Sequence, residues 1–112
     1  MSYVYSNRLC CEALRLISSD EEFETRLVRA FSEMSVSREG DTSAEIWKEW
    51  KQLEEKYYKI SGEIFKQRKE GIVDEKITAQ LRKFSEYLVA VICDWIEFNS
   101  SQISKGKLRK AT

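Results

Sequence analysis

The fold of this protein is decided by residues 43–100, SAEIWKEWKQLEEKYYKISGEIFKQRKEGIVDEKITAQLRKFSEYLVAVICDWIEFNS. Two series of apolar residues run through this stretch in alternating steps of four and three, which is the spacing of one helix face packed along a partner. The first series is Ile46, Trp50, Leu53, Tyr57, Ile60 and Ile64, and the second is Ile77, Leu81, Phe84, Leu88, Val91, Trp95 and Phe98. Between them, Gly71 can end one helix and Asp74 can cap the next. We therefore predict two long helices, over residues 42–70 and 74–100, that pair as an antiparallel hairpin.

The part of the chain before this hairpin predicts two shorter helices. Residues 3–17 carry one apolar face, and a second helical pattern extends from the Ser18–Glu22 segment to Met34. Ser19 has the three-residue spacing to a glutamate that a capping box requires, which favours a break between the two helices. A series of helical spacing from Leu9 to Met34, in which Asp20 is the one polar member, leaves one continuous helix as the alternative. The predicted fold is an all-α, antiparallel bundle of four helices, or of three if the first two are continuous.

The two long helices also raise the question of what covers them. Short helices lying end to end, or one continuous helix, would span the hairpin within one molecule. Short helices folded back on each other would leave half of the hairpin uncovered, and the protein would have to oligomerise or bind a partner. Between residues 84 and 98, eleven of fifteen residues are apolar, which favours burial on more than two sides of that helix. We therefore expect a homo-oligomer or a complex with another protein.

The length and charge of the chain indicate one domain followed by a basic tail. The chain has 112 residues with no proline and four glycines, and its nineteen basic residues balance nineteen acidic ones. Residues 101–112 hold four basic residues and no acidic one, so the first 100 residues carry a net charge of −4. We predict a helical domain over 1–100 and a flexible tail over 101–112. The tail's basic residues, which could contact nucleic-acid phosphates, are Lys105, Lys107, Arg109 and Lys110.

Several classes of function find little support in the composition. The chain has no histidine, which removes the commonest general base and a common metal ligand. A carboxylate site for magnesium at Glu45 and Glu49 is disfavoured because lysines are interleaved with the acids. The three cysteines, Cys10, Cys11 and Cys93, suit buried structural roles in a reducing interior. We expect a cytoplasmic protein with no cofactor, metal, small-molecule substrate, secretory signal or membrane span.

The candidate interface residues are aromatic side chains of the hairpin. Antiparallel pairing sets Trp50 level with Trp95, with Trp47 and Phe98 close by. These rings, with Tyr87, are either core material or interface anchors, because tryptophan and tyrosine dominate binding hot spots. We predict a non-enzymatic protein–protein interaction module that buries an apolar helical face through them. The alternative is a nucleic-acid-associated accessory protein in which oligomerisation multiplies the basic tail.

One glycine inside the first long helix also needs a local reason. Gly62 costs about 1 kcal/mol of helix propensity relative to alanine. The pairing places it near Phe84, so we predict that it makes room for that ring.

Overall fold

The computed structural model describes residues 3–71 and 75–111, with residues 107–111 described by their backbone alone. These residues form four helices and no strand: α1 (Tyr3–Ile17), α2 (Phe23–Met34), α3 (Ala44–Glu70) and α4 (Glu75–Ala111). The predicted all-α bundle of four helices is therefore confirmed. The alternative of one continuous N-terminal helix is wrong, because the chain leaves the helical conformation after Ile17.

The break between α1 and α2 is real, but the predicted capping box is not formed. The Ser19 hydroxyl donates to the carbonyl of Leu16 at 2.9 Å, and the Arg26 guanidinium donates to the carbonyl of Ile17 at 2.8 Å. Glu22, at the start of α2, makes no side-chain capping hydrogen bond. These polar groups thus satisfy the last carbonyls of α1, which lack partners within their own helix, and do not cap α2.

The ends of α3 lie close to their predicted positions. Its N-cap is Ser43 rather than Thr42, and the Ser43 hydroxyl accepts a hydrogen bond from the backbone N–H of Ile46 at 3.2 Å. Its C-cap is Gly71, with a φ of 72° in the left-handed region that glycine adopts without a steric cost. The predicted cap of the next helix, Asp74, lies outside the described residues.

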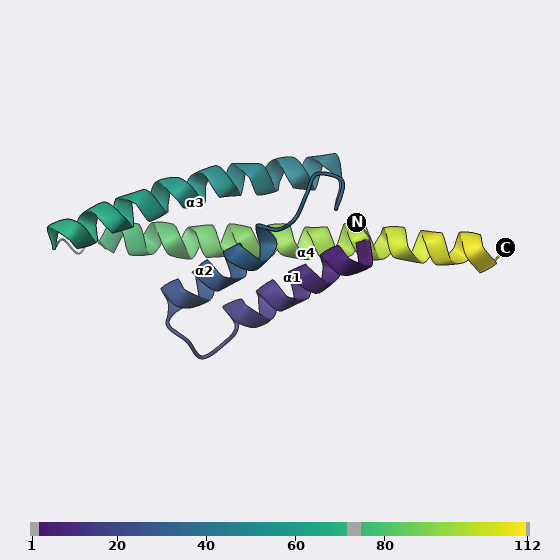
Figure 1. The fold of residues 1–112 in the computed structure, drawn as a ribbon, viewed down its shortest axis with the longest axis horizontal. Helices are drawn as coiled ribbons and strands as arrows, with labels where there is room; N and C mark the ends of the chain where they lie inside the picture. The colour runs from purple at the N-terminus through teal and green to yellow at the C-terminus, as the bar shows by residue number, and fades with distance from the viewer. Residues whose placement is uncertain (1–2, 72–74, 112) are drawn as a thin grey trace.

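The last helix is longer than predicted. Instead of ending at Ser100, α4 continues to Ala111, so residues 101–111 extend the helix past the other three (Figure 1). The segment has no proline, and Gly106 is its one strong helix breaker, costing only about 1 kcal/mol. Polar composition, which suggested a helix end, does not by itself stop a helix.

The four helices form two hairpins of unequal length (Figure 1). α3 lies antiparallel to α4, α1 packs against α4, and α2 folds back on α1. The described residues span 63 × 28 × 19 Å. Of the two arrangements considered from the sequence, this is the one in which the short helices fold back on each other and leave part of the long hairpin uncovered. Figure 1 shows α3 and α4 continuing past α2 toward their connection.

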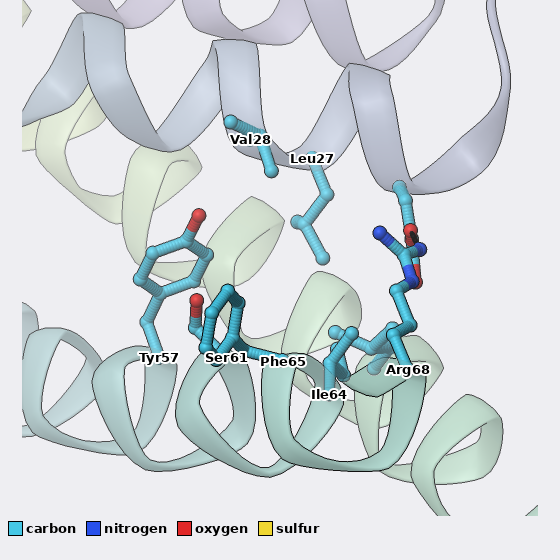
Figure 2. Close-up of a pocket in the computed structure, with 9 residues that line it drawn as sticks. Leu27, Val28, Tyr57, Ser61, Ile64, Phe65 and Arg68 are labelled. Carbon is cyan, nitrogen blue, oxygen red and sulfur yellow. Dashed lines mark hydrogen bonds and ion pairs between the residues drawn. The ribbon is translucent and has the colours of Figure 1, made fainter. Parts of the chain in front are cut away.

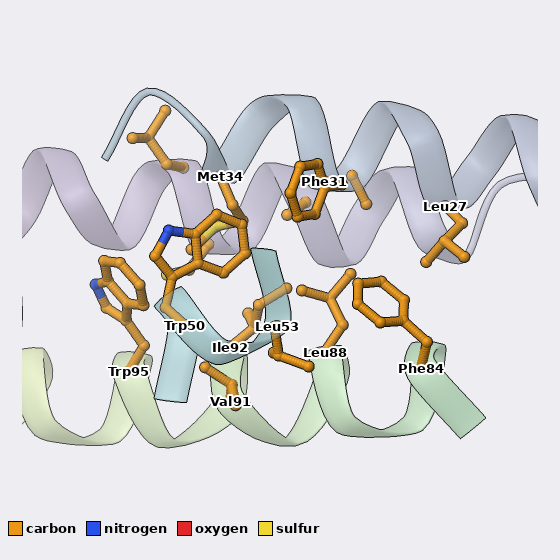
Figure 3. Packing of buried hydrophobic residues seen from close by; sticks show 14 of the residues in the cluster. Leu27, Phe31, Met34, Trp50, Leu53, Phe84, Leu88, Val91, Ile92 and Trp95 are labelled. Carbon is orange, nitrogen blue, oxygen red and sulfur yellow. The ribbon is translucent and has the colours of Figure 1, made fainter. Parts of the chain in front are cut away.

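The core is an aromatic cluster centred on Phe31 of α2. Its ring stacks on Tyr57 with centroids 3.9 Å apart, and it lies 5.1 Å from Trp50 and 6.4 Å from Phe84. Figure 3 shows α2 contributing Phe31 and Met34 from one side and α3 and α4 closing the cluster from the other. The buried residues of the cluster are Leu9, Cys10, Ala13, Leu27, Ala30, Phe31, Met34, Trp50, Leu53, Ile77, Leu81, Phe84, Leu88, Val91, Ile92 and Trp95.

The pairing of α3 with α4 follows the predicted register. The Trp50 and Trp95 rings meet edge to face with centroids 6.4 Å apart, as expected for residues at one level of the hairpin. Gly62, however, does not make room for Phe84. A Cβ built at Gly62 would meet no atom within 4 Å, and the residue is exposed. Phe84 packs instead against Tyr57.

Two buried hydrogen bonds tie α4 to the rest of the bundle. The indole N–H of Trp95 donates to the Ser6 hydroxyl of α1 at 2.7 Å, and the Asn99 amide donates to the carbonyl of Asp41 at 2.8 Å. Ser6, Trp95 and Asn99 are fully buried. Because an unpaired polar group would be costly there, these bonds help to select how α1 and the α2–α3 loop sit on α4.

Candidate interaction surface

Two of the predicted interface residues belong to the core. Trp50 and Trp95 are 1% and 0% exposed, so neither offers a surface to a partner in this structure. For these two rings the core interpretation holds, because α1 and α2 cover this level of the hairpin (Figure 3).

The other three predicted residues differ in exposure. Trp47 is half-buried, with its ring centroid 6.3 Å from that of Trp95. Phe98 is also half-buried and makes an edge-to-face contact with Tyr3 at 6.1 Å. Tyr87 is 53% exposed, so it is the predicted residue that a partner could reach most readily.

Tyr87 lies where two adjacent hollows meet on the surface of the long hairpin. Each hollow has a volume of about 320 Å³, and every residue that lines them belongs to α3 or α4. We call the two hollows together the hairpin groove. It is lined by Glu49, Gln52, Leu53, Lys56, Lys59, Ile60, Gln80, Lys83, Phe84, Tyr87, Ala90, Val91 and Asp94, of which Lys56 and Tyr87 line both hollows.

The floor of the hairpin groove is apolar because it is the back of the core. Leu53, Phe84 and Val91 are buried, and Ile60 is partly buried against the same cluster. At the centre, the Lys56 ammonium lies 5.3 Å from the centroid of the Tyr87 ring, within the range of a cation–π contact.

Charged residues on the rim of the groove are separated by sign. In the antiparallel register, Lys59 and Lys83 lie toward the α3–α4 connection, whereas Glu49 and Asp94 lie toward the opposite end. The groove is therefore basic at one end and acidic at the other, with an apolar floor and the Lys56–Tyr87 contact at its centre.

A second apolar hollow lies between α2 and α3, nearer the α3–α4 connection. This turn-end pocket has a volume of about 200 Å³ and is lined by Glu24, Leu27, Val28, Tyr57, Ser61, Ile64, Phe65, Arg68 and Leu81. Figure 2 shows Leu27 and Val28 facing the side chains of α3 across the hollow. Phe65 is 72% exposed at its edge, and an ion pair between Glu24 and Arg68 bridges α2 and α3. The spacing of apolar residues in the sequence did not predict this pocket, because the pocket depends on how α2 packs against α3.

The cysteines do not all occupy the buried positions that were predicted. Cys10 is fully buried in the core, and burial raises the pKa of its thiol to about 12, with smaller contributions from Cys11 and Cys93. Cys11 and Cys93 are exposed, so the prediction of a buried role is wrong for these two. The apolar character of α4 suggested burial all round, but α1 and α2 are too short to cover every side of it.

Sites of other kinds find no geometry in the described residues. Among residues 3–71 and 75–106, no group of three or more cysteine, aspartate or glutamate side chains could hold a metal ion. No helix in the described part of the chain is long and apolar enough to cross a membrane. Of the basic tail, Lys105 is exposed on α4, and the side chains of Lys107, Arg109 and Lys110 lie outside the described part of the chain.

Comparison with known proteins does not add a relative to this description. No family model, curated protein or solved structure matches the chain.

Proposed function

We propose that the protein is a non-enzymatic protein–protein interaction module that acts by burying the uncovered apolar surface of its α3–α4 hairpin. One observation carries the proposal: α1 and α2 pack on each other, and Tyr87 and Phe65 remain 53% and 72% exposed beside apolar hollows. Aromatic side chains that border hollows on a rigid scaffold are typical binding hot spots.

The character of the hollows favours a protein partner over a small molecule. The hairpin groove is a shallow surface feature that runs along two helices, and its floor is aliphatic and aromatic. Pockets that hold substrates or cofactors usually enclose the ligand and present convergent polar groups to it. A reducing, cytoplasmic setting belongs to the same proposal, because it would keep the exposed thiols of Cys11 and Cys93 from pairing.

Site-specific photo-crosslinking in cells tests the proposal. Replacing Tyr87 or Phe65 by the photoreactive residue p-benzoylphenylalanine should yield discrete protein adducts when irradiated. The matched control is Thr25, which is exposed on α2 and lines neither hollow. The three variants should have equal melting temperatures, so that differences in adducts report surface position. Absence of adducts at both hairpin positions, or equal adducts at Thr25, would overturn the proposal.

A further inference from the structure

We infer that the hairpin groove is the interface of a two-fold symmetric homodimer, in which a second copy of this chain lies antiparallel across the groove. The inference rests on the proposed function and names its partner. It follows from the order of charges along the groove and from the shape of its centre.

The charges of the groove complement themselves when the surface is reversed. A two-fold axis brings one surface patch against the same patch running in the opposite direction. Lys83 and Lys59 would then face Asp94 and Glu49 of the second copy. A parallel arrangement would instead set like charges opposite each other, which is unfavourable.

The spacing of these charges is compatible with a single axis. On α4, the midpoint of Lys83 and Asp94 falls between residues 88 and 89, and on α3 the midpoint of Glu49 and Lys59 falls at residue 54. The ring contacts of Trp95 with Trp47 and Trp50, and of Phe84 with Tyr57, place residue 54 at the level of residues 87–91, which brackets the α4 midpoint. One two-fold axis at that level, lying between the two copies and perpendicular to the helices, therefore relates the charges of both α3 and α4.

The two helices also place their charges at similar distances from that axis. Lys83 and Asp94 are eleven residues apart, and Glu49 and Lys59 are ten residues apart. At 1.5 Å per residue, these separations are roughly 16 Å and 15 Å. Each charge therefore lies about 8 Å from the axis, so all four charged positions meet an opposite charge in the same arrangement.

The centre of the groove fits the same axis. Tyr87 and Ala90 lie at equal distances on either side of the α4 midpoint, so the Tyr87 ring would pack over the small side chain of Ala90 in the second copy. Lys56 and Gln52 likewise lie at equal distances on either side of the α3 midpoint. Lys56 would therefore face Gln52 of the second copy, and no two like charges would face each other at the centre. An exposed aromatic residue beside an exposed alanine forms a projection and a recess of complementary shape.

The turn-end pocket lacks these features. Its charged residues, Glu24 and Arg68, already pair with each other. The hairpin groove is therefore the surface that best fits a second copy of the chain.

Light scattering on the full chain across a hundredfold dilution tests the inference. The wild-type protein should reach twice the 13.2 kDa mass of one chain at the concentrated end. Lys83→Glu and Asp94→Lys should each weaken dimerisation about tenfold or more, because each change occurs twice in the interface and sets like charges opposite each other. The double variant should regain most of the lost affinity, since exchanging both charges restores the pairing. Tyr87→Ala should also weaken the dimer.

Control variants separate this inference from the proposed function. Phe65→Ala changes an exposed ring outside the groove and should leave the dimer intact, and the melting temperature of every variant confirms that it is folded. A strict monomer at all concentrations overturns the inference, as does a dimer that is unaffected by Tyr87→Ala and both charge reversals. If photo-adducts at Tyr87 then contain a different protein, the proposed function survives. If there are no adducts at Tyr87 or Phe65, it fails as well.

Discussion

Replacing Ser6 with alanine should destabilise the protein by removing one buried hydrogen bond. The Ser6 hydroxyl accepts the indole N–H of Trp95 at 2.7 Å, and both side chains are fully buried. After Ser6→Ala, the indole N–H has lost this partner in a site that water does not reach. Leaving a buried donor unpaired costs about 1 to 3 kcal/mol.

A control serine removes the contribution of helix propensity from this comparison. Alanine is a better helix former than serine by about 0.5 kcal/mol, which would hide part of the loss. Ser32 is an exposed residue within α2, so Ser32→Ala includes the same gain without the buried bond. Relative to Ser32→Ala, the Ser6→Ala protein should unfold at a temperature lower by roughly 4 to 20 °C.

The assay is thermal and urea unfolding followed by circular dichroism at one protein concentration, because dimerisation would make stability concentration-dependent. A double-mutant cycle with Trp95→Phe provides the decisive comparison. In that background no indole donor remains, so Ser6→Ala should cost much less than it does in the wild type. Equal stability of Ser6→Ala and Ser32→Ala, or the same cost of Ser6→Ala in both backgrounds, would refute the assignment.

Three further predictions concern the turn, the buried thiol and the C-terminal segment. Gly71→Ala should destabilise the protein by about 1 to 2 kcal/mol, because the φ of Gly71 is 72°. Gly62→Ala, in open space on α3, should stabilise the protein by up to about 1 kcal/mol. Urea unfolding measures both variants, and a change of stability in the same direction for both would contradict the assignment. Because the Cys10 pKa is raised from 9.0 to about 12, the folded state keeps its proton where the unfolded state loses it. The unfolding free energy should therefore fall as the pH rises from about 9 toward 12, and fall less in Cys10→Ala, while a thiol reagent near pH 8 should label Cys11 and Cys93 but not Cys10. Deleting residues 101–112 should leave the protein dimeric, with a mass twice that of the shortened chain, and should not reduce its binding to nucleic acid. Salt-sensitive nucleic-acid binding that disappears with the deletion would favour the nucleic-acid alternative.

The long hairpin could be predicted because its information is local. The alternating spacing of apolar residues from Ile46 to Phe98 determines which face of each helix is buried. Gly71 marks the end of α3 because few other residues adopt its backbone conformation. Together they set the register, which the contact between Trp50 and Trp95 confirms.

The packing of the short helices could not be predicted in the same way. Whether α1 and α2 lie end to end or fold back depends on the loop between them and on tertiary contacts such as that of Trp95 with Ser6, which is 89 residues away in the chain. The exposure of Cys93 follows from that choice. Its position in the most apolar part of α4 indicated burial, but its side chain remains exposed in the folded protein.

The hairpin groove illustrates how local and long-range information combine in this protein. The sequence places Tyr87 among candidate anchors, yet the separation of charge around it emerges only when α3 and α4 are set in register. Glu49 and Lys59 lie among other charged residues that read as an ordinary solvated face along the chain. On α4, Asp94 lies at the same end of the groove as Glu49, and Lys83 lies at the same end as Lys59. Both helices therefore run from a basic end of the groove to an acidic end. Two helices with matching polarity and a shared midpoint complement their own reversed copy, and this complementarity is the basis on which we propose a second copy of the chain as the partner of the hairpin groove.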